Sequence, residues 1–177
     1  YNSSIVIGKG RTAGICSNSC NIKNSYNTGN IISTLTNSSG DITAGILGAG
    51  GMVVNTYNSG TISSSYASVG GIGGYSIKTI YNSYNLGNID ANSSWAGGIL
   101  GAFYSVSTLN DNYNSGNINN KGGGIVGSQE QDKGLSFIKE FITNNYYLKG
   151  TASYGISQYN SNEGASPLEA SQMPSVI

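Results

Sequence analysis

Apolar and polar positions along this chain recur with a period of roughly 30 residues. The clearest repeating unit, called the Tyr motif below, is a tyrosine that is usually followed by Asn, with Gly three positions and Ile five positions after it. The tyrosines stand at Tyr26, Tyr57, Tyr84 and Tyr113, with a weaker copy at Tyr146. The glycines are Gly29, Gly60, Gly87 and Gly116. Such regular spacing indicates a repeat protein in which each unit adopts the same local structure.

A second motif, called the Gly-Ile motif below, alternates with the first. It consists of one or more small residues and glycines before an isoleucine, as in Ala44-Gly45-Ile46-Leu47-Gly48. Its isoleucine recurs at intervals of 31, 26, 27 and 26 residues, at Ile15, Ile46, Ile72, Ile99 and Ile125. One full repeat therefore carries both motifs.

A third element precedes each motif tyrosine, with an aliphatic residue four positions upstream and Asn or Asp two upstream, as at Val53 and Asn55. This alternation predicts a short, half-buried strand. Each repeat is therefore expected to hold three short strands, around the Gly-Ile motif, around Ile-x-Asn-x-Tyr and around Asn-Ile, with Gly/Asn turns between them.

Three short strands cannot enclose a core by themselves, so the repeats must stack. We predict an all-β fold, a right-handed parallel β-solenoid of about five coils, in which equivalent residues form ladders about 4.8 Å apart. In this arrangement the motif glycines are expected to adopt positive φ in a turn, and asparagines to bond to the coils above and below. The motif tyrosines form either a structural stack or a platform for a ligand, and their regular register favours the stack.

The pattern divides the chain into a repeat array at residues 1–145 and a C-terminal capping segment at 146–177. Residues 128–141 are an insertion that holds five of the sixteen charged residues, and it is either a functional loop or a solvated one. Ser166-Pro167-Leu168-Glu169 resembles a helix start and predicts a helical turn near residues 167–173. We expect this tail to cover the open end of the stack.

Composition supports a repetitive fold and removes several classes of function. Gly and Asn supply more than a quarter of the 177 residues, charged residues are 9%, and the net charge is zero. With eight Lys and Arg residues in all, the chain has no basic surface for nucleic acid, and no apolar run is long enough for membrane insertion.

Enzymatic activity, a cofactor and a metal are not expected. Histidine is absent, which removes the commonest general base and metal ligand. The acidic residues are scattered along the chain, and only Asp90 and Asp111 lie near corresponding turns of neighbouring repeats.

Two residue groups stand outside the repeat. Cys16 and Cys20 are spaced either for a disulfide across a tight turn or for two free thiols in the wall. The aromatic residues Tyr75, Trp95, Phe103 and Tyr104 are candidates for contact with a sugar or a protein partner, although they equally suit gap filling at corners.

The combination of Ala-Gly-Ile-Leu-Gly with Ile-x-Asn-x-Tyr-Asn-x-Gly-Asn-Ile resembles the GLUG repeat over about residues 12–127. This resemblance implies a secreted or wall-attached bacterial surface protein, in which such arrays accompany adhesin modules or flank the protease domain of immunoglobulin A1 metallopeptidases. The repeats are not the catalytic part of those proteins. The chain departs from the motif with Ile in place of Leu, and with Ser or Thr before the tyrosine where many copies have Cys.

We therefore expect a non-catalytic module that acts as a spacer or stalk on the cell surface or in a secreted protein. The alternative is an adhesin module that binds a host or cell-surface glycan or protein. Because the chain begins inside a repeat, at Tyr1, neighbouring domains of a longer chain are the expected partners.

Overall fold

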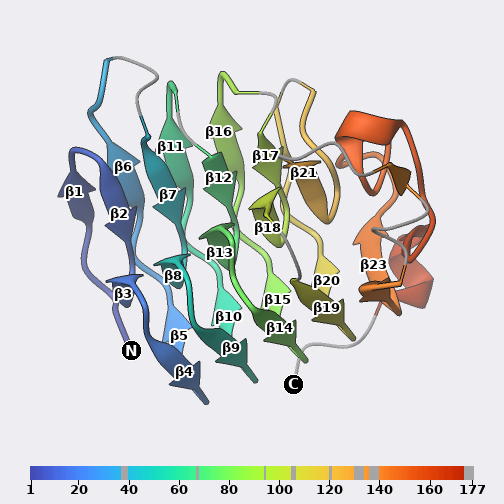
Figure 1. The fold of residues 1–177 in the computed structure, drawn as a ribbon, viewed down its shortest axis with the longest axis horizontal. Coiled ribbons are helices and arrows are strands. Elements are labelled where there is room, and N and C mark those ends of the chain that lie inside the picture. The colour runs from blue at the N-terminus through green and yellow to red at the C-terminus, as the bar shows by residue number, and fades with distance from the viewer. Residues whose placement is uncertain are drawn as a thin grey trace.

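The computed structural model describes residues 1–36, 40–66, 68–93, 95–104, 107–119, 121–129, 134–135 and 140–173. These residues form an all-β parallel β-solenoid of about four turns, with a short C-terminal segment. In Figure 1 the strands of successive coils lie side by side in rows, and the chain runs from the first coil in blue to the C-terminal segment in red. The predicted fold class is confirmed.

Each complete coil contributes one strand to each of five parallel sheets, which follow one another along the chain as sheets B, C, D, E and A. Sheet B contains β1 (Val6–Gly8), β6 (Ile31–Ser33), β11 (Ile62–Ser64) and β16 (Ile89–Ala91). Sheet C contains β2 (Arg11–Ala13), β7 (Ile42–Ala44), β12 (Ser68–Gly70) and β17 (Ala96–Gly97).

The other three sheets extend into a fifth, incomplete coil. Sheet D contains β3 (Cys16–Asn18), β8 (Leu47–Ala49), β13 (Gly73–Tyr75), β18 (Leu100–Phe103) and β21 (Val126–Gln129). Sheet E contains β4 (Asn21–Lys23), β9 (Met52–Val54), β14 (Thr79–Tyr81), β19 (Thr108–Asn110) and β22 (Ile142–Thr143). Sheet A contains β5 (Tyr26–Asn27), β10 (Tyr57–Asn58), β15 (Tyr84–Asn85), β20 (Tyr113–Asn114), β23 (Asn145–Leu148) and β24 (Ala165–Leu168).

Equivalent residues of successive repeats lie directly above one another. Tyr57 pairs with Tyr26 on one side and with Tyr84 on the other, and Ile62 pairs in the same way with Ile31 and Ile89. The isoleucines of both motifs consequently fill the interior, where Ile46, Ile62, Ile72 and Ile99 have no exposed surface. Burial of these columns is the main favourable contribution to folding, because it removes apolar area from water in every coil.

The prediction of three strands per repeat is wrong, because each repeat holds five. Asn55 has φ 54° and Asn82 has φ 48°, so the left-handed backbone two residues before the tyrosine ends one strand and starts the next. The Gly-Ile motif is divided in the same way, since Gly45 and Ile46 form the corner between β7 and β8. At both corners the chain changes direction within a stretch whose apolar and polar residues alternate as in a single strand.

The prediction that the Tyr-motif glycines need positive φ is also wrong. Positive φ among the described glycines occurs elsewhere, for example at Gly50 (67°) and Gly51 (70°). Gly60 is required for a different reason: a β-carbon there would overlap the carbonyl carbon and oxygen of Gly29 in the preceding coil. The Tyr-motif glycines form a column in which backbones approach more closely than any side chain allows.

The C-terminal segment continues the solenoid before it ends it. β23 crosses the predicted boundary at residue 145, and β24 adds a further parallel strand in which Tyr147 pairs with Pro167. The helix predicted from Ser166 therefore starts later, as the 3-10 helix η2 (Ala170–Gln172), while η1 (Ser157–Tyr159) precedes β24. Pro167 is tolerated because β24 is the edge strand of sheet A, where a missing N–H breaks no ladder.

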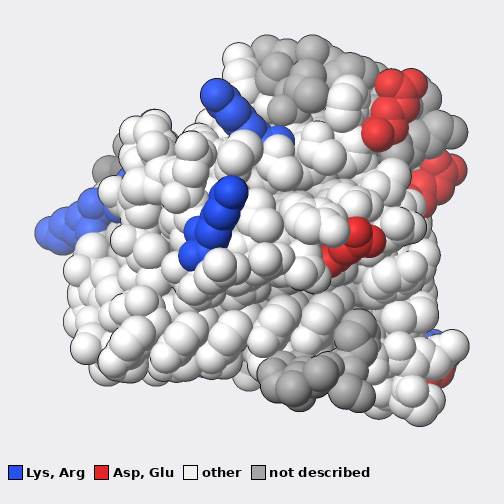
Figure 2. Space-filling model, turned by 90° about the horizontal axis from the view of Figure 1, so that it is seen from below, with Lys and Arg blue, Asp and Glu red and all other residues white. Residues whose placement is uncertain are grey.

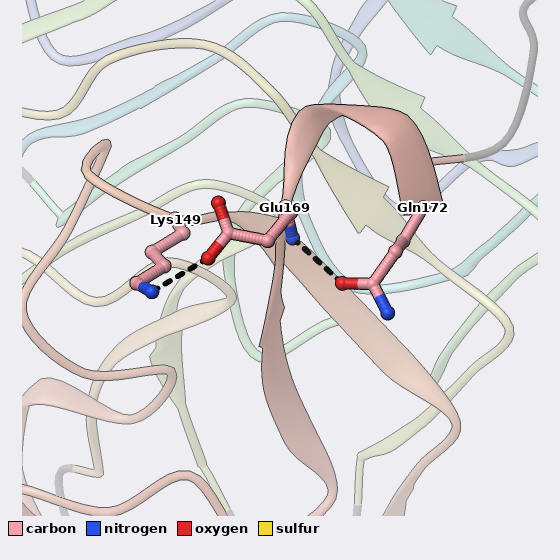
Figure 3. A network of polar contacts seen from close by, with 3 residues as sticks. All are labelled: Lys149, Glu169 and Gln172. Atoms are coloured by element: carbon pink, nitrogen blue, oxygen red, sulfur yellow. Dashed lines mark hydrogen bonds and ion pairs between the residues drawn. The ribbon is translucent and has the colours of Figure 1, made fainter.

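Polar contacts on the surface fix the start of η2. Glu169 and Gln172 form a reciprocal capping box, in which the Glu169 backbone N–H donates to Gln172 Oε1 at 3.1 Å. The other end of the Glu169 side chain accepts from Lys149 Nζ at 2.6 Å, as Figure 3 shows. This hydrogen bond, with the carboxylate charge, raises the pKa of Lys149. Most of the insertion predicted at residues 128–141 lies outside the described residues.

Candidate functional site

The motif tyrosines stack ring on ring along one side of the solenoid. Neighbouring ring centroids are 4.9–5.1 Å apart with interplanar angles of 4–9°, and the stack comprises Tyr1, Tyr26, Tyr57, Tyr84 and Tyr113. This spacing follows the distance between parallel strands, so the rings repeat with the backbone. Tyr1 extends the predicted set. Tyr146 pairs with Tyr113 in backbone register, but its ring does not join the stack.

A ladder of asparagine side chains runs directly behind the tyrosines. Asn58 has no exposed surface; its Nδ2 donates to Gly60 O at 2.8 Å in its own coil and to Asn85 Oδ1 at 2.8 Å in the next. The same pair of bonds is made by each preceding and following rung, and the rungs are Asn2, Asn27, Asn58, Asn85 and Asn114, the last of which makes only the bond within its coil. The predicted asparagine stacking is confirmed in atomic detail.

The glycine of the Gly-Ile motif serves this ladder. A β-carbon at Gly45 would overlap both the backbone of Gly71 and the side chain of Asn58. The equivalent glycines Gly14, Gly71 and Gly98 lie against Asn27, Asn85 and Asn114 in the same way. The two sequence motifs are therefore structurally coupled: the asparagine of the Tyr motif fills the space beside the glycine of the Gly-Ile motif.

Tyr147 ends the asparagine ladder. It pairs with Asn114 and so occupies the position of the next rung, with 2% of its surface exposed. Its hydroxyl donates to Asn162 Oδ1 at 3.1 Å, and Asn162 Oδ1 also accepts from the Gly155 N–H at 2.8 Å. The ring of Tyr147 thus takes the place of an asparagine amide at the end of the ladder, and Asn162 of the capping segment accepts the hydrogen bond of its hydroxyl.

The residues just before the tyrosines form a second buried ladder that sequence analysis missed. Thr56 N donates to Ser83 Oγ at 3.2 Å, and Ser83 N donates to Asn112 Oδ1 at 3.0 Å. Asn112 Nδ2 in turn donates to Asn145 Oδ1 at 2.9 Å. The four residues directly precede Tyr57, Tyr84, Tyr113 and Tyr146, so a polar residue just before each of these tyrosines was the available signal.

Stacking also changes the acidity of the tyrosines. Burial, and then the neighbouring Tyr84, raise the pKa of Tyr113 from 10.0 to about 12, and burial with the neighbouring Tyr57 raises the pKa of Tyr84. In the unfolded chain these hydroxyls lose their protons near pH 10. Between pH 10 and about 12 the folded state therefore holds more protons, and folding free energy is lost as the pH rises.

We accordingly expect the melting temperature to fall through this alkaline window. Tyr113→Phe removes one titrating group and should make the decline shallower than in the wild type. The check is thermal unfolding followed by circular dichroism at a series of pH values, with tyrosinate absorbance recorded in parallel. Identical alkaline slopes for wild type and variant would contradict the assigned pKa of Tyr113.

Cys16 and Cys20 form a disulfide in the first coil. Their sulfur atoms join the first residue of β3 to the corner that follows this strand, and both residues pack against the apolar core. The spacing of the two cysteines fitted either a disulfide or two free thiols, and the structure contains the disulfide.

The four candidate contact aromatics do not form one cluster. Tyr75 ends β13 and Tyr104 follows β18, and their rings stack at 5.9 Å with an interplanar angle of 29°. Tyr104 has 36% of its surface exposed. Trp95, 39% exposed, lies instead at the corner between sheets B and C. Phe103 has no exposed surface and belongs to the core, so its assignment as a contact residue was wrong: it alternates with Tyr104 across the wall.

Charged groups are sparse and do not gather into a site among the described residues. On the face shown in Figure 2, basic and acidic side chains are few and separated by wide uncharged areas. Asp90 lies in β16 of sheet B and accepts from Asn119, whereas Asp111 follows β19 of sheet E, so the two do not pair. In the part of the chain that the structure describes, no group of three or more His, Cys, Asp or Glu residues is arranged for a metal.

None of the described helices has the length and apolar character needed to span a membrane. The fold and its ladders place the chain in the class of parallel β-solenoids with repeats of about 27 residues and stacked asparagines. Searches of protein-family models, curated proteins and solved structures found no match to this chain.

Proposed function

We propose that this chain is a non-catalytic spacer module of a bacterial cell-surface or secreted protein. The observation that carries the proposal is the continuity of the wall: every sheet passes through four successive coils in register. Backbone hydrogen bonds join successive coils, and two buried side-chain ladders reinforce them, one from Asn2 to Asn114 and the other from Thr56 to Asn145. A stack of this kind holds its two ends at a fixed separation, which is the physical requirement for a stalk.

Three further observations support this assignment. The resemblance to the GLUG repeat implies an exported bacterial surface protein that carries other domains. The Cys16–Cys20 disulfide suits an oxidising, extracellular location. The sparse charge and scattered carboxylates among the described residues fit a module without chemistry of its own.

Rigidity is the property to measure. Spin labels on Lys9→Cys and Ser153→Cys, two exposed positions in the first coil and in the C-terminal segment, report the distance between the ends by pulsed electron resonance. A spacer gives one narrow distance distribution that does not change with added glycan or protein. A broad or multiple distribution would remove the basis of the proposal.

The stacked Tyr75–Tyr104 pair favours one alternative, an adhesin module that binds a surface glycan. Aromatic faces of this kind stack on sugar rings. A glycan array with purified protein tests it: binding lost in Tyr104→Ala but kept in Tyr66→Ala, a matched change at another exposed tyrosine, supports the adhesin. Binding that survives Tyr104→Ala places any glycan contact elsewhere, with Trp95→Ala as the next variant.

A further inference from the structure

The corner between sheets B and C in the second and third coils holds buried polar side chains that belong to neither of the two ladders. Asp41 is 4% exposed, Thr43 has no exposed surface, and Ser64 is 4% exposed. Elsewhere these two sheets bury apolar side chains such as Ile62 and Val69. Burying polar groups where apolar ones pack in neighbouring coils is unfavourable unless something bonds to them.

These side chains share the corner because of the strand register. Ser33 ends β6 and donates from Oγ to Asp41 Oδ2 at 2.6 Å. Ser64 ends β11 and, one step beyond the pairing of Ser63 with Ile32, falls beside Ser33. Thr43 follows Asp41 by two residues and so points to the same side of β7.

Three buried oxygen atoms at this corner have no hydrogen-bond partner: Asp41 Oδ1, Thr43 Oγ1 and Ser64 Oγ. They are grouped by the fold, yet none is close enough to another polar atom to bond directly. Buried hydroxyls and carboxylates are nearly always satisfied, so these three atoms mark a place where a small bridging species can bind.

The register also shows that the polar set does not continue into the following coils, although Thr12 precedes Thr43 in the first coil. The position of Ser64 is occupied by Ala91 in the next coil, and that of Thr43 by Val69 and then Ala96. The solenoid therefore accepts apolar residues at these positions. A generic structural need for oxygen atoms at this corner therefore does not explain the presence of Thr43 and Ser64.

We propose that this corner binds a monovalent alkali-metal cation, sodium or potassium, through Asp41 and the neighbouring hydroxyl oxygens. A hard cation prefers oxygen ligands. The charge of the site selects the class: Asp41 is the one carboxylate, and a single positive charge neutralises it, whereas a neutral water would leave the buried charge uncompensated.

Thermal unfolding in sodium, potassium and choline chloride at equal ionic strength, with EDTA present throughout, tests the proposal. Choline is too large for the corner, so only the alkali cations stabilise the folded state by binding it. We expect the wild-type melting temperature to be about 3 °C higher in one of the alkali salts than in choline. Asp41→Asn, which keeps the size and removes the charge, should give equal values in all three salts.

Asp90→Asn is the matched control, since Asp90 is an exposed carboxylate on a strand of sheet B and should retain the wild-type response. Equal wild-type melting temperatures in the three salts would overturn the proposal, as would an unchanged cation response in Asp41→Asn. If Asp41→Asn does not fold, a wild-type crystal grown in rubidium chloride decides the question. An anomalous peak beside Asp41 Oδ1 supports the cation, and a peak without anomalous signal identifies water and refutes it.

Discussion

Gly60→Val is expected to lower the melting temperature by on the order of 10 °C, because it forces a side chain into a close backbone contact between two coils. A β-carbon at Gly60 already overlaps the carbonyl of Gly29, which also accepts from Asn27 Nδ2. Relief requires the coils to separate at this column, and separation stretches the asparagine bonds beside it. The expected loss is about 4 kcal/mol.

Ser59→Val is the matched control for this prediction. Ser59 is the exposed neighbour of Gly60, and its equivalent in the next coil is Leu86, so this column tolerates an apolar side chain. Its melting temperature should stay within about 2 °C of the wild type. If Gly60→Val and Ser59→Val had the same melting temperature, the close approach of Gly60 to Gly29 would not explain why glycine is required at position 60.

Gly60 is required for a different reason from the one that the sequence suggests. The recurrence of glycine at this position predicts that glycine is required there, and the expected reason was a left-handed turn. Periodicity identifies which residues lie above one another, because the pattern is a property of the repeat. Periodicity does not reveal whether a glycine is needed for its φ or for its missing β-carbon, because both requirements select the same residue.

The strands show a similar division. The columns of Tyr57, Asn58 and Ile62 were predictable because identical residues recur in register. The five-stranded coil was not, because the left-handed Asn55 interrupts an alternation that otherwise looks like one strand. Asparagine is common both in such corners and in ladders, and the sequence alone does not distinguish these two roles.

Features that occur once were the hardest to predict. The polar corner at Asp41 combines residues of the second and third coils that do not recur together, so it interrupts the repeat without forming a pattern of its own. The separation of Trp95 from Tyr75 and Tyr104 depends on which corner each occupies, and this follows from the number of strands per coil. Phe103 lines the interior because it alternates with the exposed Tyr104 along the wall, a distinction that its place near the Gly-Ile motif does not reveal.

The second large effect is expected for Asn58→Ala. Removing this rung leaves Gly60 O and Asn85 Oδ1 without their donor and deprives Asn27 Nδ2 of an acceptor, all in an environment without water. Each orphaned buried group costs about 1–3 kcal/mol, and the vacated volume adds to the loss. The variant should lose about 4 kcal/mol of stability, which lowers the melting temperature by on the order of 10 °C.

Asn55→Gly provides the comparison, because Asn55 belongs to a ladder of the same chemistry on the surface. Its amide donates to Asn24 Oδ1 at 3.2 Å and accepts from Asn82 Nδ2 at 2.8 Å, but water replaces both partners. Glycine keeps the left-handed backbone of φ 54°, so the change isolates the side-chain bonds. We expect a loss below about 1 kcal/mol, measured by denaturant unfolding. Equal losses in the two variants would mean that burial does not set the strength of the ladder, and the stiffness proposed for the module would then need another source.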